Sequence, residues 1–342
     1  MELWELSLAQ FSISKFYKTL IGNYGENREN SYFLAVFHDY LDKSVKIAIL
    51  IWMVKISAVF NKINLLRERY YKASTGKDAL IKLLGEAEIA EQVYNSNAIE
   101  NSTLTLEETE KILLAIDLDR FITEREIFET KNLARVVLYI NKRAKEQELT
   151  LEVILSLHKI LLSNIRDDIA GRWRINNEYV RVGSHIAPAP KEILERLEKM
   201  LEDYNASSHE NIIKRIAKLH LVFEYTHPFI DGNGRLGRVL NNYLLIREGF
   251  VPINIKFIDR KKYYKAFNEF DKKGVTTTME EIVGKALTNS YHKRLAYLEN
   301  KTIITLAEYG KTNKLSHSNL INKAGRQTIE AFLEKGIWKI GV

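Results

Sequence analysis

The chain has 342 residues, of which 46% are hydrophobic and 28% are charged, a composition typical of a globular protein with a sizeable core. It contains no cysteine, which excludes disulfides, thiolate nucleophiles and zinc sites with cysteine ligands. The formal net charge is +7. Because the basic residues are spread along the sequence, this charge favours an anionic partner without separating nucleic acid from nucleotide.

The first 60 residues form a region that we expect to be helical and to which we assign no role. The opening MELWELSLAQFS has acids where a signal peptide has a basic start, and it lacks a cleavage site of small residues. The most apolar run, residues 47–54, is far shorter than the roughly 20 residues of a membrane span. We therefore expect a cytoplasmic protein with no membrane partner.

Most of the remaining chain has the periodicity of amphipathic helices, which predicts a mainly α fold. ASTGKD, residues 73–78, breaks the pattern, and Thr105 with Glu108 forms a capping box that starts a helix. The predicted helices cover residues 44–71, 79–96, 126–146, 151–163, 191–204 and 210–226.

Residues 175–190 have a different pattern, that of a short β-hairpin. Tyr179 and Arg181 alternate with Val180 and Val182, between an Asn-Asn pair and a Gly-Ser pair. Because an isolated hairpin is only marginally stable, we expect this one to pack beside a functional part of the molecule.

HPFIDGNGRLGR, residues 227–238, is the most unusual run in the chain. Gly232 and Gly234 flank Asn233, so the backbone here can take left-handed conformations that turn successive N–H groups inward. The residues that follow are helical in pattern, and a concave set of amides before a helix binds anions. On the glycines alone, a plain helix–turn–helix junction is an equally good interpretation.

The charged residues of this run favour the anion site. Arg235 and Arg238 lie three apart on one helix face, with no acid in that helix before Glu248, and two guanidinium groups suit a polyphosphate. Asp231 would repel phosphate unless a cation lay between them, which suggests Mg²⁺; capping of the next helix is the alternative. His227 can accept a hydroxyl proton, although a lone histidine at a helix end is more often structural.

This run resembles the signature of the Fic family, His-x-Phe-x-(Asp/Glu)-Gly-Asn-Gly-Arg-x-x-Arg, at every defined position. Supporting features extend from about residue 63 to the end of the chain. The resemblance implies a Fic-fold helical bundle that transfers AMP from ATP to a hydroxyl of a target protein. Gly234 is retained where a kinase-like branch of the family has lysine, which favours nucleotidyl transfer.

The resemblance also implies a role for each residue of the motif. His227 would be the general base, Asp231 the Mg²⁺ ligand and Phe229 the hydrophobic anchor of the loop. The implied nucleotide-binding residues are Gly232, Asn233, Gly234, Arg235 and Arg238. The hairpin residues Tyr179, Val180, Arg181 and Val182 would form a flap that aligns a target segment by strand pairing.

A second motif, SNAIEN at residues 96–101, places Ser96 and Glu100 on one helix face. A polar helix end is the simplest interpretation. The run also resembles the inhibitory motif Ser/Thr-x-x-x-Glu-Gly/Asn of the Fic subclass with an N-terminal inhibitory helix. If Glu100 pairs with Arg238, that arginine cannot hold the γ-phosphate, so we expect an autoinhibited enzyme. Removal of AMP by the same glutamate is the alternative.

The tail resembles a winged helix-turn-helix module. We expect a short helix over residues 302–310, a Ser-capped helix over 316–325, and a third helix from Arg326 to Glu334 that leads into a strand. A second wing strand would be expected where the chain stops, so the wing looks incomplete.

This tail supports a second hypothesis, a DNA-binding regulator. Lys314, Lys323 and Arg326 are basic, but Glu330 and Glu334 dilute the charge of the expected recognition helix. We therefore favour a protein-docking role for the tail over DNA binding.

The predicted organisation has four parts. An N-terminal helical region covers residues 1–60, and helices with the inhibitory motif cover 61–125. The Fic catalytic core covers 126–290, and the winged helix-turn-helix domain covers 299–342. The resemblance adds self-modification and a homodimer as possible properties.

Overall fold

The structure is a computed structural model that describes residues 43–118, 120–182 and 185–342. The chain divides into two compact units, Met1–Ala58 and Val59–Val342. Most of the region predicted over residues 1–60 lies outside the described residues. Among the helices that are described, none has the length and apolar character needed to cross a membrane.

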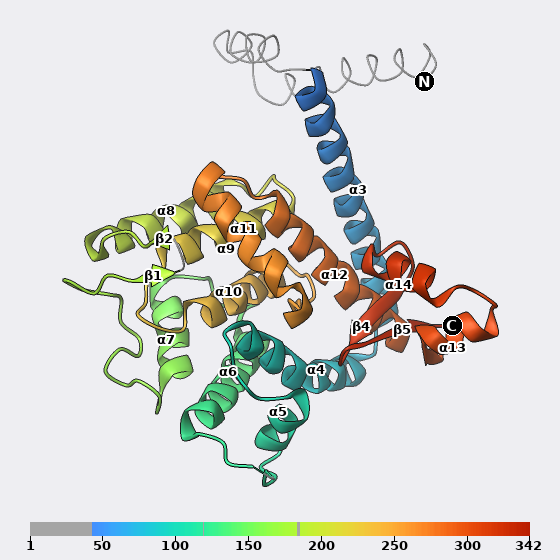
Figure 1. The fold of residues 1–342 in the computed structure, drawn as a ribbon, viewed down its shortest axis with the longest axis horizontal. Helices are drawn as coiled ribbons and strands as arrows, with labels where there is room; N and C mark the ends of the chain where they lie inside the picture. Colours follow the sequence, from blue (N-terminus) through green and yellow to red (C-terminus); the bar gives the residue numbers. More distant parts are fainter. Residues whose placement is uncertain (1–42, 119, 183–184) are drawn as a thin grey trace. The chain divides into compact units, whose positions relative to one another are not determined.

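Helices make up most of the described chain, as predicted (Figure 1). They are α3 (Lys43–Ser74), α4 (Asp78–Ile99), α5 (Leu106–Leu113), α6 (Glu124–Arg143), α7 (Leu151–Leu162), α8 (Ile193–Ala206), α9 (Ile212–Thr226), α10 (Asn233–Arg247), α11 (Arg260–Lys273), α12 (Thr277–Leu298), α13 (Leu306–Thr312) and α14 (His317–Gly325). Two 3₁₀ turns, η1 (Pro190–Glu192) and η2 (Phe257–Asp259), precede α8 and α11. The strands are β1 (Arg181–Val182), β2 (His185–Ile186), β3 (Ile303–Thr305), β4 (Ala331–Glu334) and β5 (Ile337–Gly341).

Side-chain caps set several of the helix starts. The capping box predicted at Thr105 is present: its side chain accepts a hydrogen bond from the Glu108 N–H, and the Glu108 carboxylate accepts one from the Thr105 N–H. Thr123 caps α6 in the same way. Asn211 accepts from the Lys214 N–H, so α9 begins at Ile212, two residues later than predicted.

Helix α10 lies at the centre of the bundle and contacts α9, α6, α7 and α4 (Figure 1). Nearly all of its residues are buried, including Leu236, Leu240 and Tyr243. Each such apolar side chain contributes roughly 1.5–3 kcal/mol when it is fully buried. The start of α10 and the loop before it are therefore held by a rigid support.

The hairpin predicted between α7 and α8 is present but short. Arg181 pairs with Ile186 and Val182 with His185 in antiparallel register, and the Ala187 N–H donates to Val180 O at 3.0 Å. Tyr179 lies outside the strand and is exposed. The hairpin leaves the bundle on the side opposite the C-terminal strands (Figure 1).

The C-terminal residues form a small sheet covered by two helices. The strand order is β3-β5-β4, with both pairs antiparallel, and α13 and α14 supply apolar residues to the cluster Leu306, Leu320, Ala324, Ala331 and Ile340. This part is fastened to α12 and α4. The Leu333 N–H donates to Asn289 Oδ1 at 2.7 Å, and the Lys335 N–H donates to Glu91 Oε1 at 2.8 Å.

Three details of the predicted tail are wrong. A second strand was expected to be missing at the end of the tail, but β4 and β5 are both present and pair with each other. The helix expected over residues 302–310 begins only at Leu306, because 303–305 form strand β3. The third helix, expected from Arg326 to Glu334, is replaced by a turn and strand β4. Lys335 and Gly336 have positive φ values of 49° and 78°, the conformation of a tight hairpin turn, and so direct the chain back into β5. The Ser316 cap of α14 is confirmed.

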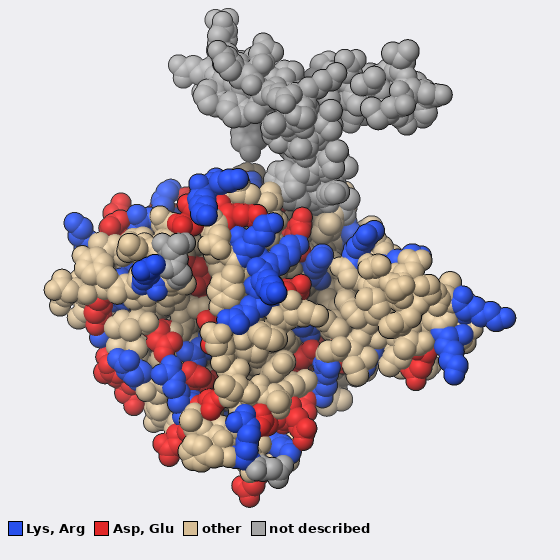
Figure 2. All heavy atoms as spheres, in the orientation of Figure 1, with Lys and Arg blue, Asp and Glu red and all other residues tan. Residues whose placement is uncertain are grey.

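Acidic and basic side chains are interspersed over the face drawn in Figure 2. Ion pairs between neighbouring turns of one helix, such as Lys199 with Asp203 and Lys265 with Glu269, also bring opposite charges together. The view agrees with the even spread of charge along the sequence.

Candidate functional site

The loop between α9 and α10 takes the tight conformation that its glycines suggest. Its first residue, His227, ends α9 in the left-handed region with φ 46°, and Gly232 has φ 82° directly before α10. Asn233 closes the loop, since its side chain accepts from the Phe229 N–H at 3.0 Å and donates to Phe229 O at 2.8 Å. What Asn233 offers to a ligand is therefore its backbone N–H, one of those at the helix start with no partner inside the helix.

A buried arginine that the sequence analysis missed holds the start of the loop. Arg174 is 1% exposed, and its guanidinium donates to the carbonyl oxygens of His227, Glu178, Pro188 and Thr226. It bridges the loop to the base of the hairpin. These hydrogen bonds offset the cost of the left-handed conformation at His227.

The middle of the loop is fixed by Phe229, which is fully buried as expected for an anchor. The His158 ring stacks on Phe229 with centroids 3.6 Å apart. The Gly171 N–H donates to His158 Nδ1 at 3.0 Å, so Nε2 carries the proton and donates to Asp231 O at 3.0 Å. Burial lowers the pKa of His158 to about 4, which keeps this ring neutral.

The tautomer of His227 follows from its one hydrogen bond on the ring. Nδ1 lies 3.3 Å from Glu224 O. Because a carbonyl oxygen only accepts, Nδ1 carries the proton and Nε2 keeps its lone pair. Burial lowers the pKa of His227 to about 4, so the ring is neutral at pH 7 and can accept a proton.

Asp231 lies between two arginines and does not cap α10. Oδ1 accepts from the Gly232 N–H at 2.6 Å and from Arg235 at 3.0 Å, and Oδ2 accepts from Arg125 at 2.7 Å. Burial acts to raise the pKa of Asp231, but the charges of Arg235 and Arg125 outweigh it and lower the pKa. The carboxylate is therefore ionised at neutral pH.

The two arginines of the motif have carboxylate partners from other parts of the chain. Arg235 is buried and pairs with Glu129 on α6 at 3.1 Å as well as with Asp231. The absence of acids in α10 was therefore no guide to whether these arginines are paired. The acids come from the loop before α10, from α6 and from the residue that follows α4.

Arg238 is held by the helix that precedes the catalytic region. Its side chain is 8% exposed and donates to Ser96 Oγ at 2.9 Å, Ser96 O at 2.8 Å and Glu100 Oε1 at 2.9 Å. The same guanidinium donates to the Tyr263 hydroxyl at 3.1 Å. Ser96 and Glu100, at the end of α4, thus meet Arg238 as anticipated from the sequence.

The Glu100 carboxylate also lies over the glycine-rich loop. A Cβ atom added to Gly234 would come 2.1 Å from Glu100 Oε1, so only glycine permits this approach. The same space is next to the N–H groups at the start of α10, which favour an anion. A carboxylate from the chain itself occupies part of the expected anion site.

Two cavities meet at this point. The first, of about 260 Å³, is lined by the aromatic residues Tyr225, Tyr263, Tyr264, Phe267 and Phe270 together with Val182 and His185 of the hairpin. The second, of about 210 Å³, is polar and includes Arg125, Glu129, Asp231 and Arg235. Glu100, His227 and Gly234 line both.

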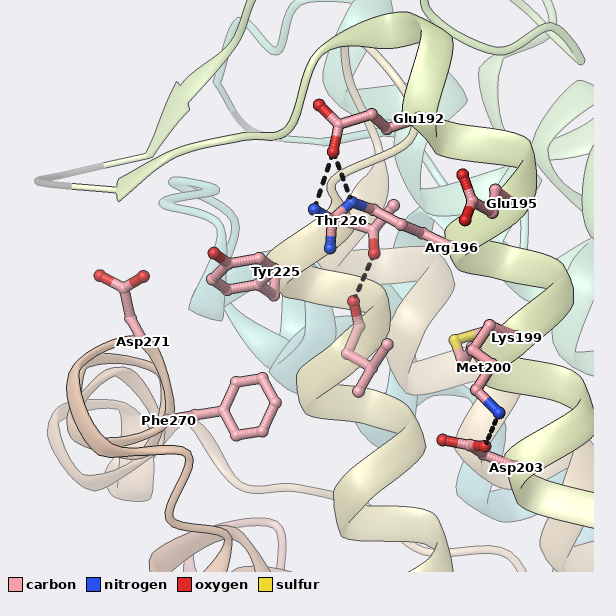
Figure 3. Close-up of a pocket in the computed structure, with 11 residues that line it drawn as sticks. Glu192, Glu195, Arg196, Lys199, Met200, Asp203, Tyr225, Thr226, Phe270 and Asp271 are labelled. Atoms are coloured by element: carbon pink, nitrogen blue, oxygen red, sulfur yellow. Dashed lines mark hydrogen bonds and ion pairs between the residues drawn. The ribbon is translucent and has the colours of Figure 1, made fainter. Parts of the chain in front are cut away.

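A wider groove of about 570 Å³ adjoins the aromatic cavity (Figure 3). Figure 3 shows Arg196 and Lys199 of α8 on one side and Phe270 with Asp271, at the end of α11, on the other. Tyr225, Phe270 and Asp271 line both the groove and the aromatic cavity. The hairpin is joined to this region by His185, whose ring lies 3.0 Å from Asp271 Oδ1 and 2.8 Å from Tyr225 O.

Most of the residues expected at the site lie around these cavities. Of the four hairpin residues, only Val182 lines the aromatic cavity, whereas Tyr179, Val180 and Arg181 do not. The sequence analysis missed Arg125, Glu129, Arg174, Glu224 and Tyr263. An arginine between apolar residues directly before the hairpin was a signal for Arg174; the others come from distant helices and have no local pattern.

Comparison with known proteins supports the resemblance seen in the sequence. Residues 148–245 match the Fic/DOC family. Proteins named protein adenylyltransferase Fic are 32% identical over 219 residues in Nematostella vectensis and 30% identical over 262 residues in Drosophila melanogaster. These alignments cover 62% and 72% of this chain but 50% and 51% of the relatives. The chain thus spans about half the length of these curated relatives.

Solved structures with a Fic domain have a similar fold. A Fic domain-containing signalling protein from Bacteroides thetaiotaomicron has a TM-score of 0.63 at 22% identity, with 70% of this chain and 97% of that chain covered. Fic-1 from C. elegans has a TM-score of 0.62 at 22% identity, with 75% and 76% covered. The described helices therefore have Fic-fold structural neighbours.

Proposed function

We propose that the protein transfers AMP from ATP to a hydroxyl group of a protein substrate. The observation that carries this proposal is the position of His227. This residue lines both cavities, and its ring Nε2 has a lone pair that can accept a proton. The aromatic cavity suits a nucleobase, and the polar cavity with the α10 amides suits phosphates. The similarity to proteins named protein adenylyltransferase supports the same reaction.

The reaction is a displacement at the α-phosphorus. The hydroxyl oxygen of the substrate forms a bond to that phosphorus, and His227 Nε2 accepts the hydroxyl proton. The bond from the α-phosphorus to the bridging oxygen breaks, and pyrophosphate leaves. The backbone N–H groups of Gly232, Asn233 and Gly234 and the guanidinium groups of Arg235 and Arg238 bind the phosphate oxygens.

Asp231 is the residue that would hold Mg²⁺. A single carboxylate is a sufficient protein ligand for this ion, which fills its remaining positions with phosphate oxygens and water. Asp231 fits, because its lowered pKa keeps it ionised and it lines the polar cavity. Bound there, the ion would neutralise phosphate charge. Arg125 pairs with the same carboxylate and would have to move aside.

We further propose that the described arrangement is autoinhibited. Glu100 pairs with Arg238 and lies against Gly234, so its carboxylate competes with a phosphate for the same two partners. Competition of this kind typically lowers a binding affinity by a factor of about 10 to 100. Glu100 is 36% exposed on its side chain, so it can leave without unfolding the core.

Two further parts have assigned roles in the proposal. The hairpin β1–β2 acts as the flap, because Val182 and His185 reach the aromatic cavity from one side. The C-terminal helices and sheet act as a winged-helix docking module, since the order β3, α13, α14, β4, β5 follows that layout. Self-modification and a homodimer stay predictions.

The test is incorporation of label from α-labelled ATP with Mg²⁺, with lysate as the source of substrates. Wild type should label weakly, Glu100→Gly strongly, and Glu100→Gly/His227→Ala not at all. Glu86→Ala is the matched control, because it removes an exposed carboxylate of α4 without placing a second glycine beside Gly85, and it should behave as wild type. Absence of label in a folded Glu100→Gly variant would contradict the proposal.

A further inference from the structure

A buried carboxyl group outside the signature motif lies beside the proposed base. Glu224 is on α9, one turn before His227, and its Oε2 lies 3.9 Å from His227 Nδ1. Its Oε1 is buried and has no hydrogen-bond partner among the described residues. Burial, and after it the charge of Glu100, raises the pKa of Glu224 to about 8. In this arrangement Glu224 is mostly protonated at neutral pH.

Glu224 belongs to a polar cluster in the wall of the aromatic cavity. A Cβ atom on Gly237 would lie 2.5 Å from Glu224 Oε1 and 3.1 Å from His220 Nδ1, so both groups press against the backbone of α10 beside Arg238. His220 Nε2 lies 2.7 Å from the Tyr263 hydroxyl. The titratable and charged groups around Glu224 and His227 are His220 on α9, Arg238 on α10, Tyr263 on α11, Glu100 after α4, His185 on β2 and Arg174.

The charges in this cluster allow only one ionised carboxylate at a time. Within the part of the chain that the structure describes, the guanidinium group that pairs with Glu100 is that of Arg238, and a buried charge needs an opposite charge beside it. While Glu100 pairs with Arg238, a second carboxylate would be uncompensated, which favours protonated Glu224. Withdrawal of Glu100 leaves Arg238 without that partner, and Glu224, whose carboxyl group already interacts electrostatically with Arg238, is placed to replace it.

We propose that Glu224 is a positioning residue for His227 and that Glu100 controls its charge. With Glu100 in place, Glu224 is neutral and gives no electrostatic support to a protonated His227. With Glu100 withdrawn, Glu224 ionises and stabilises the imidazolium that forms when His227 takes the substrate proton. The inference rests on the proposed function for the role of His227 as the base. It adds a second effect of Glu100 to the blocking of Arg238.

The direction in which the pKa of His227 changes when the Glu100 charge is removed separates this mechanism from a direct effect of Glu100 on the ring. Glu100 is itself a negative charge that raises the pKa of His227. If Glu224 stays neutral, removal of the Glu100 charge must lower the pKa of His227. If Glu224 ionises in its place, a carboxylate one turn away on the same helix acts on the ring, and the pKa of His227 rises.

The experiment is an NMR titration of the histidine rings in the full chain without nucleotide. The His227 signals are assigned by their absence in His227→Ala, and wild type is compared with Glu100→Gln, Glu224→Gln and the double variant. Glutamine keeps the shape of each side chain and removes its charge. We expect His227 in Glu100→Gln to titrate at higher pH than in wild type, within about pH 5 to 8. In the double variant this rise should be lost.

A matched control is Glu100→Gln/Glu280→Gln. Glu280 is also a buried glutamate with a raised pKa, but it lies on α12 outside both cavities. This double variant should keep the rise seen with Glu100→Gln. A lowered or unchanged His227 pKa in Glu100→Gln, or a rise that persists after Glu224→Gln, would overturn the inference.

A kinetic experiment tests the role of Glu224 separately from the proposed AMP transfer. In the Glu100→Gly background, addition of Glu224→Gln should move the acidic limb of the pH–rate profile to lower pH and reduce the maximal rate about tenfold. AMP transfer that depends on His227 but keeps the same profile after Glu224→Gln would leave the function standing and reject the role of Glu224.

Discussion

The loop over residues 227–238 and the end of α4 both contribute to the site, but they are built in different ways. The loop has its own short-range hydrogen bonds, from Asn233 to Phe229 and from Asp231 to Gly232 and Arg235, and buried side chains of the catalytic bundle support it from outside. The end of α4 reaches the same place through contacts between residues that lie 138 and 142 positions apart in the chain.

The difference separates the chemistry from its control. The hydrogen bonds within the loop, together with those from Arg174 and His158, do not involve Glu100, so they hold the loop geometry whether or not Glu100 is in place. Glu100, in contrast, depends on the position of a whole helix, which is fastened by buried ion pairs at Glu88 and Glu91. Changes inside the loop should therefore abolish activity, and changes along α4 should release it.

The largest effect should come from Gly232→Ala in the Glu100→Gly background. Gly232 has φ 82°, a conformation that strains alanine, and an added Cβ would lie 2.8 Å from Leu162 Cδ2, so either Leu162 or the loop backbone must shift. A displacement near 1 Å costs on the order of 100-fold in rate, which AMP incorporation would measure. Gly76→Ala is the control, since Gly76 also has a positive φ but nothing lies within 4 Å of its added Cβ. Equal activity of the two variants would show that the loop tolerates distortion.

Asp231→Asn should have the next largest effect. The change removes the proposed metal ligand and the partner of Arg125, so we expect a loss of about ten- to hundredfold that added MgCl₂ partly restores. The measurement is the rate of AMP incorporation against Mg²⁺ concentration. Asp168→Asn, which removes an exposed partner of Arg166, is the control. An unchanged Mg²⁺ dependence would exclude Asp231 as the ligand.

Glu91→Gln tests the other side of the comparison. Glu91 is buried in α4 and accepts from Lys256 Nζ at 2.6 Å and from the Lys335 N–H at 2.8 Å. Loss of this charge should weaken the attachment of α4 and so the hold of Glu100 on the site. We expect basal AMP transfer to rise about three- to tenfold while the melting temperature falls. Glu86→Gln changes an exposed glutamate of the same helix and should alter neither. A destabilised variant with unchanged transfer would show that Glu100 acts independently of the helix.

The same difference explains what could be predicted from the sequence. Helix positions, the Thr105 capping box and the loop over residues 227–238 follow from neighbours a few positions apart. The partners of the motif, such as Glu129 for Arg235 and Tyr263 for Arg238, come from other helices and leave no local pattern.

The wrong tail prediction has a related cause. Residues 326–334 look helical by periodicity, but Glu330 pairs with Arg69 and Glu334 pairs with Lys293, on helices far away in the chain. The Lys335–Gly336 turn was the available local signal for a hairpin. Tertiary pairing outweighed helix propensity in this segment.

The smallest effect should be on the stability of the fold, and it concerns Glu224, which interacts with both His227 and Glu100. The folded pKa of Glu224 is about 8 against an ordinary value of 4.5. The unfolded chain therefore loses this proton first, and stability from the neutral carboxyl is present below about pH 4.5 and lost as the pH rises towards 8. Glu224→Gln does not ionise, so its melting temperature should exceed that of wild type by a few degrees near pH 8 and match it near pH 4. Glu107→Gln, an exposed change, should show no such divergence in calorimetry. If the melting temperatures of Glu224→Gln and wild type changed in parallel with pH, Glu224 would already be ionised in the folded protein. In that case Glu100 would have no control over its charge.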